Sequence, residues 1–245
     1  MSHAAHHATL QYAVERSRDS WEIMEDVMPE SVLHDEAVEL LKALLAVWAA
    51  RIGSAKVVRN LAVRWDEQRP RVGVDPDVCV LSPPPPDIRD LRSVRTWLPG
   101  HVPPVLAVEV VSETNPHKDY AVAPEKYAAS GAGELWIFDP LLCGPTSHGG
   151  PLRLQVWCRA TGGTLARVYA GDGPAFSPTI GAYLVTSDEG RKLRIASDEG
   201  ATDFWSTSEE AERAAKEAER AAKEHALARV AELEADLARR GGSTE

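Results

Sequence analysis

The chain has 245 residues, which allows one large domain, or one ordinary domain with an appendage, at about 100–200 residues per domain. Hydrophobic residues make up 44% of the chain, enough for a real core, and the net charge of −10 argues against a generally basic coat for nucleic acid. Apolar runs stop short of the roughly 18–20 residues of a membrane span, and three scattered cysteines exclude a disulfide framework. We therefore expect a cytoplasmic protein with no membrane partner.

Three zones follow from the composition: an N-terminal lead-in (residues 1–30), a body (31–197) and a tail (208–240). The body opens with an amphipathic helix. Ser31 is a typical N-cap, and apolar residues recur behind it at three- and four-residue steps until Gly53.

Extended segments come next. Residues 57–65 and 72–81 favour strands, and four prolines at 83–86 open a long loop, because proline cannot continue a sheet ladder. The most apolar strand candidate covers residues 105–111. A helix is expected over 120–130, with Pro124 near its first turn and Gly131 at its end.

Further strands are expected in the second half of the body, at residues 135–138, 152–158, 165–169 and 179–184. Strands and helices that share one apolar sheet indicate a layered α/β domain.

The tail contains a near-perfect seven-residue repeat, EAERAAK, at 210–216 and again at 217–223. This period is typical of a coiled coil or of a long solvated helix. One interpretation is a single helix held by Glu–Lys and Glu–Arg pairs, worth a few tenths of a kcal/mol each. The other is self-association through Val230, Leu233 and Leu237. We expect a homo-oligomer, with residues 208–240 as the candidate contact.

The most informative feature is a carboxylate inside an apolar strand. Glu109 shares its strand face with Ala107 and Val111, and the residues that alternate with them are also apolar. Such a strand is covered on both sides. An unpaired buried carboxylate costs several kcal/mol, so Glu109 must be protonated, paired with a base or bound to a cation.

A second carboxylate repeats the situation. Asp77 stands at the start of the apolar run 78–81, so two strands each present one acid, which suits a hard divalent cation such as Mg²⁺. Other interpretations remain open. Asp77 could be a turn residue after Pro76, and Glu109 could pair with Arg64 or Arg71. Paired carboxylates also serve in glycoside hydrolysis.

Beyond these two residues, several segments resemble a known family. The run at 74–80, the run at 106–112, and then Asp119, Tyr127 and residues 134–140 are similar to the Uma-two family of restriction endonucleases, within the PD-(D/E)XK nuclease superfamily. His34, which opens the first helix, fits the family pattern as well. The resemblance covers roughly residues 21–184, and Asp119 is expected to cap the helix after it.

The resemblance implies a restriction-endonuclease-like fold, with a mixed central sheet flanked by helices. It also implies a metal-dependent endonuclease in which Asp77 and Glu109 hold one or two Mg²⁺ or Mn²⁺ ions. Such an ion would activate a water for attack on a DNA phosphodiester. His34 would be an accessory residue near the site.

One departure from the family concerns its lysine. The superfamily slot two residues after the acid is Val111, and the family slot four residues before Tyr127 is Ala123. The nearest candidates to compensate are Lys126, our catalytic candidate, and Lys118. Lys126 lies about 60° from Ala123 around an ideal helix.

If neither lysine compensates, the alternative is a non-catalytic, nuclease-like binding or assembly protein that oligomerises through its helical tail. The acidic net charge of the chain is compatible with this alternative as well.

Overall fold

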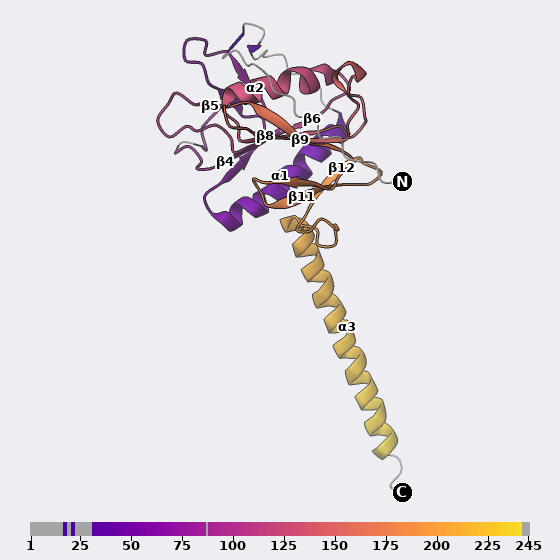
Figure 1. Ribbon diagram of the computed structural model, residues 1–245. Helices are drawn as coiled ribbons and strands as arrows, with labels where there is room; N and C mark the ends of the chain where they lie inside the picture. Colours follow the sequence, from indigo (N-terminus) through magenta and orange to yellow (C-terminus); the bar gives the residue numbers. More distant parts are fainter. Residues whose placement is uncertain (1–16, 19–20, 23–30, 87, 242–245) are drawn as a thin grey trace. The chain divides into compact units, whose positions relative to one another are not determined.

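The computed structural model describes residues 17–18, 21–22, 31–86 and 88–241 (Figure 1). Most of the expected lead-in, residues 1–30, lies outside the described residues. The chain divides into two compact units, Met1–Trp205 and Ser206–Glu245, which are described separately below. Within the described part of the chain, none of the helices combines the length and apolar character that crossing a membrane requires.

The expected first helix is α1 (Val32–Ile52). It begins where the Ser31 hydroxyl accepts a hydrogen bond from the backbone N–H of His34, at 3.2 Å. It ends at Gly53, whose left-handed backbone (φ 69°) lets its N–H bond to the carbonyl of Ala49. Both ends are therefore set by the residues that the sequence indicated.

A six-stranded sheet forms the centre of the first unit. Its spatial order is β1 (Lys56–Val58), β4 (Val78–Leu81), β6 (Leu106–Val110), β7 (Glu134–Phe138), β8 (Leu154–Arg159) and β9 (Leu165–Gly171). β6 and β7 run parallel and the other neighbours run antiparallel, so the sheet is mixed. The predicted fold class, a mixed central sheet with flanking helices, is confirmed.

Two three-stranded sheets accompany the central one. The first contains β10 (Ala175–Ser177), β11 (Ala182–Ser187) and β12 (Lys192–Ala196). The second contains β3 (Gly73–Val74), β2 (Ala62–Arg64) and β5 (Ser93–Arg95), in that order.

Two of the expected strands are interrupted. The segment 57–65 divides into β1 and β2 at Asn60, whose φ of 51° reverses the chain. The segment 72–81 divides into β3 and β4 around Pro76, which has no N–H to donate to a ladder. The long loop after the prolines contains β5, which the sequence reading did not predict.

The central sheet is covered on both faces, as the apolar pattern of β6 predicted. Leu106, Val108 and Val110 belong to the core cluster formed with α1. Ala107 and Val111 belong to the cluster formed with α2 (Ala123–Ser130), which lies over the opposite face (Figure 1). The sheet of β10, β11 and β12 packs against the other side of α1.

A short π-helix, η2 (Lys118–Val122), precedes α2 directly. The backbone N–H of Ala123 bonds to the carbonyl of Lys118, five residues earlier. Such wide turns are rare in proteins, and those that occur are often found at functional sites. This one lies in the connection that follows β6.

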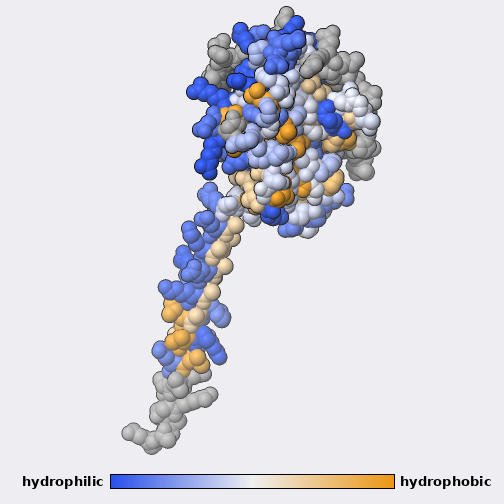
Figure 2. Space-filling view, turned by 90° about the vertical axis from the view of Figure 1, so that its left-hand side faces the viewer, coloured by the Kyte–Doolittle hydropathy of each residue, from blue (hydrophilic) through white to orange (hydrophobic). Residues whose placement is uncertain are grey.

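The second unit is the helix α3 (Ser208–Gly241). Thr207 and Glu210 exchange hydrogen bonds at its start, a capping box. All described side chains from Ala211 to Ala235 are exposed. Figure 2 shows apolar side chains along this helix, most hydrophobic in its C-terminal half, where Leu227, Val230 and Leu233 are exposed.

Candidate functional site

Glu109, on β6, is a buried acid with few hydrogen bonds. The residue is 2% exposed. The Tyr127 hydroxyl on α2 donates to its Oε1 at 2.6 Å, and the Lys118 Nζ lies 3.8 Å from its Oε2. The pKa of Glu109 is raised to about 7: burial is the main cause and Asp77 and Asp75 add to it, whereas Lys118 and the hydrogen bond from Tyr127 lower it. The negative charge of Glu109 is therefore costly near neutral pH.

Asp77 lies beside Glu109 because of the antiparallel pairing of β4 with β6. The register pairs Val78 with Val108, so the next pair outward is Asp77 opposite Glu109. The Asp77 Oδ2 accepts a hydrogen bond from the backbone N–H of Val110, at 2.7 Å. The structure thus brings together the two carboxylates that the sequence singled out.

His34 reaches the same place from the other layer. It is buried in the first turn of α1, and its Nε2 lies 3.3 Å from the Asp77 Oδ2. A histidine in this position can orient the carboxylate of Asp77 from the side opposite to α2. Contact of His34 with a substrate stays a prediction.

A third acid, Asp119, comes from the π-turn. It was expected only to cap a helix, yet it is buried, and its Oδ1 accepts no hydrogen bond from the described residues. Burial and the charge of Glu109 raise its pKa well above the ordinary value. The family pattern includes Asp119, but the sequence alone gave no signal that it lies among the other acids.

Lys118 is the cation in direct contact with these acids. Its Nζ lies 3.8 Å from the Glu109 Oε2 and 3.8 Å from the Asp119 Oδ1, and both carboxylates raise its pKa. Burial and the charge of Lys118 lower the pKa of Lys126, and the charge of Glu109 raises it. The structure therefore places Lys118, rather than Lys126, against Glu109.

The two vacant lysine slots are apolar positions of the core. Val111 and Ala123 are both buried in the cluster that α2 forms with the sheet. A lysine at either position would have to displace part of this packing or extend through it toward the acids. The residue types at both slots are therefore consistent with their local packing.

The arginines considered as partners of Glu109 have other contacts. The Arg71 Nε lies 3.4 Å from the Glu22 Oε2, and the Arg64 Nη1 donates to the carbonyl of Pro70 at 2.5 Å. Among the described residues, Lys118 forms the ion pair with Glu109.

The donor chemistry of the cluster fits a hard divalent cation. Asp77 lies opposite Glu109 at the end of the β4–β6 pairing, and Mg²⁺ prefers one or two carboxylates with water and phosphate as further ligands. The described residues contain no group of three or more His, Cys, Asp or Glu side chains arranged to hold a metal by themselves. Solvent and substrate would supply the remaining ligands.

Of the comparisons with known proteins, the one with family models shows a family. No curated protein matches the chain. Among solved structures, it is similar to a "putative nuclease belonging to DUF820" from Anabaena variabilis ATCC 29413, with 12% identity, 64% of this chain and 78% of that chain covered, and a TM-score of 0.44. The model of the Uma2 family, described as "Putative restriction endonuclease", matches residues 10–150, more than half of the chain. The chain belongs to the Uma2 family.

Proposed function

We propose that this protein is a metal-dependent endonuclease that hydrolyses DNA, with Asp77 and Glu109 as the residues that hold Mg²⁺ or Mn²⁺. Membership of the Uma2 family supports a nuclease in general. The observation that carries the finer proposal is the hydrogen bond from the Val110 N–H to Asp77, which holds a second carboxylate beside buried Glu109.

A divalent cation at this place would supply an activated water and would neutralise charge on the phosphate as the water attacks it. The chain's own residues prepare that place. Tyr127 fixes one oxygen of Glu109, which leaves the other oxygen to face Lys118. His34 and the Val110 N–H orient Asp77. Because two strands and two helices supply these side chains, the site should keep its geometry, and a fixed geometry favours catalysis by proximity and orientation of the reacting groups.

The test is a cleavage assay on supercoiled, linear and single-stranded DNA, with Mg²⁺ or Mn²⁺ and with a chelator. The wild type should cleave at least one form only when the metal is present, and Asp77→Ala should not. Glu109→Gln should also cleave far more slowly, and Glu134→Gln is its matched control, because Glu134 is as buried as Glu109 and lies in the next strand. The proposal fails if the wild type cleaves no DNA form, or if Asp77→Ala cleaves as well as the wild type.

The second candidate function is a non-catalytic binding or assembly protein on a nuclease-like scaffold. The apolar residues at Val111 and Ala123, where a lysine is expected, favour it. Calorimetry with Mn²⁺ discriminates between the two functions. Tight binding that disappears in Glu109→Gln would count against a purely structural role.

We also propose that α3 joins two or more copies of this chain. Leu227, Val230 and Leu233 leave between 47% and 61% of their area exposed, on a helix whose other described side chains, apart from His225, are charged or small. The ion pairs Arg220–Glu224 and Arg229–Glu232 on its surface would also support a single solvated helix. The solution mass of the full chain and of a chain lacking residues 208–245 decides: self-association through α3 predicts a monomer after deletion, and an unchanged state contradicts it.

A further inference from the structure

Among the described residues, Lys118 lies between the solvent and the two buried acids Glu109 and Asp119. Lys118 leaves 50% of its side chain exposed, whereas Glu109 and Asp119 are almost fully buried. Its ammonium lies 3.8 Å from an oxygen of each acid, too long for a tight hydrogen bond with either. The Lys118 ammonium therefore lies near both acids without a short hydrogen bond to either.

The π-turn explains how a lysine at this position reaches the acids. In an α-helix, residues five apart are about 500° around the axis, so they point about 140° away from each other. The wider turn of η2, with its bond from the Ala123 N–H to the Lys118 carbonyl, brings Lys118 closer to the face of Ala123 and Tyr127. Tyr127 on that face donates to Glu109.

We propose that Lys118 is the catalytic cation of this site: it neutralises Glu109 and Asp119 while no metal is bound, gives way when a divalent cation binds, and then contacts an oxygen of the scissile phosphate. This inference rests on the proposed nuclease function. Lys118 is half exposed and Glu109 is almost fully buried, so a phosphate that approaches Glu109 from the solvent should meet the Lys118 ammonium first.

Two opposite effects distinguish this role from that of an ordinary surface ion pair. Removal of the ammonium leaves the acids more negative, so a divalent cation should bind more tightly to Lys118→Gln. The same change removes a positive charge from the phosphate, so cleavage should slow. A surface pair such as Lys42–Glu39, at 3.6 Å on α1, has neither effect and supplies the matched control.

The experiment combines Mn²⁺ calorimetry without DNA and cleavage at saturating Mn²⁺, on the wild type, Lys118→Gln, Lys118→Arg and Lys42→Gln. Lys118→Gln should bind Mn²⁺ roughly 5- to 10-fold more tightly and lose about 10²- to 10³-fold in kcat. Lys118→Arg should keep the wild-type affinity and part of the rate, and Lys42→Gln should match the wild type in both.

A third readout guards against misfolding. Because Lys118 is half exposed, Lys118→Gln should fold, and Mn²⁺ should raise its Tm by more than it raises that of the wild type. Equal or weaker Mn²⁺ binding by Lys118→Gln, or a kcat within about threefold of the wild type, overturns the role of Lys118 and leaves the nuclease proposal standing. A wild type that neither binds Mn²⁺ nor cleaves DNA overturns both.

Discussion

Two sets of carboxylates lie in or next to the central sheet, and their hydrogen-bond partners differ. The site carboxylates are Asp77, Glu109 and Asp119. The structural carboxylates are Glu134 and Asp139, at the two ends of β7. Glu109, Glu134 and Asp139 are each at most 2% exposed, so burial does not separate the two sets.

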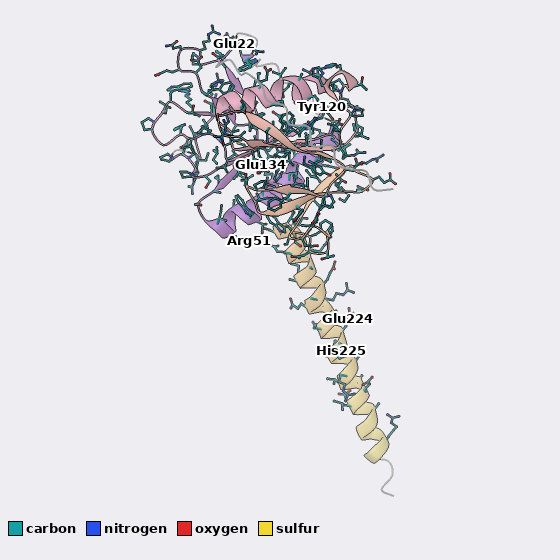
Figure 3. All side chains as sticks on the ribbon, in the orientation of Figure 1. Glu22, Arg51, Tyr120, Glu134, Glu224 and His225 are labelled. Carbon is teal, nitrogen blue, oxygen red and sulfur yellow. The ribbon has the colours of Figure 1, made fainter. Side chains whose placement is uncertain are left out.

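The structural carboxylate Glu134 is fully engaged by neutral donors. The indole Nε1 of Trp136 donates to its Oε1 at 2.5 Å, and the backbone N–H of Thr179 donates to its Oε2 at 2.9 Å. Figure 3 labels Glu134 within the layered unit. Each oxygen therefore has a donor, and the residue ties β7 to the segment before β11.

Asp139 is engaged in the same way. It accepts from the Tyr120 hydroxyl at 2.9 Å and from the backbone N–H groups of Cys143 and Gly144 at 3.0 and 2.8 Å. Tyr120, labelled in Figure 3, also exchanges hydrogen bonds with the backbone of Leu152. This network closes the turn after β7.

Two of the site carboxylates, Glu109 and Asp119, have fewer donors for comparable burial. Glu109 has one hydroxyl and the Lys118 ammonium at 3.8 Å, and Asp119 has a buried oxygen with no hydrogen bond from the described residues. Buried polar groups are usually satisfied, so a local deficit is a signal of function. Burial alone would not have distinguished Glu109 from Glu134, whereas the inventory of donors does.

The largest expected effect is on catalysis. Glu109→Gln should lower metal-dependent DNA cleavage by about 10³-fold or more, because it removes an anionic ligand. Glu134→Gln should stay within a few-fold of the wild type per folded molecule. Steady-state cleavage rates measured with saturating Mn²⁺ check both, and equal losses in the two variants would erase the distinction between the two sets.

Loss of a structural carboxylate should act on stability. Asp139→Ala leaves the backbone N–H groups of Cys143 and Gly144 without their side-chain acceptor in the turn after β7. The free energy of unfolding should fall by roughly 3–5 kcal/mol. Urea denaturation measures this loss, and calorimetry on the folded fraction should find the wild-type Mn²⁺ affinity. A weakened Mn²⁺ affinity would place Asp139 with the site carboxylates.

Glu109→Gln should raise stability, in contrast to Asp139→Ala, and the size of this gain should depend on pH. Between the ordinary pKa of 4.5 and the folded value of about 7, the folded wild type keeps a proton that the unfolded chain releases. The stability of the wild type therefore falls as pH rises through this window. At pH 8 without metal, Glu109→Gln should be more stable by roughly 3 kcal/mol, and near pH 4.5 the difference should vanish. A variant that is less stable at pH 8 would show that Lys118 and Tyr127 fully compensate the burial of Glu109.

The smallest effect is expected at Lys126. It has no ion pair with Glu109 within the described part of the chain and only senses its charge. Lys126→Ala should lower cleavage by less than about tenfold, well below the loss in Lys118→Gln. Cleavage rates of Lys126→Ala and Lys118→Gln measured side by side check this order. A larger loss in Lys126→Ala would make Lys126 the main catalytic lysine.

Part of this site could be predicted from the sequence, because an acid inside an apolar strand is conspicuous. The alternation of residues 105–111 correctly indicated a strand covered on both faces, and the caps of α1 were visible in Ser31 and Gly53. The proximity of Asp77 to Glu109 was expected from two apolar strands that each carry one acid, and the resemblance implies it as well. Pairing register, which depends on contacts between distant segments, is what brings them together.

The rest depends on features without a local pattern. The hydrogen bond of the π-turn spans five residues, from the Ala123 N–H to the Lys118 carbonyl, whereas that of an α-turn spans four. Residue propensities do not encode this difference. The short strands β5, β10 and β12 were missed because their order comes from pairing with neighbours rather than from their own composition.

The most direct test of the account is the position of a metal in the crystal. Crystals soaked in Mn²⁺ should show anomalous difference density within about 2–2.5 Å of carboxylate oxygens of both Asp77 and Glu109, and the same soak of Glu109→Gln should show none there. A soaked wild-type crystal with no density at these two side chains, or with the Lys118 ammonium still between Glu109 and Asp119 at saturating Mn²⁺, would contradict it.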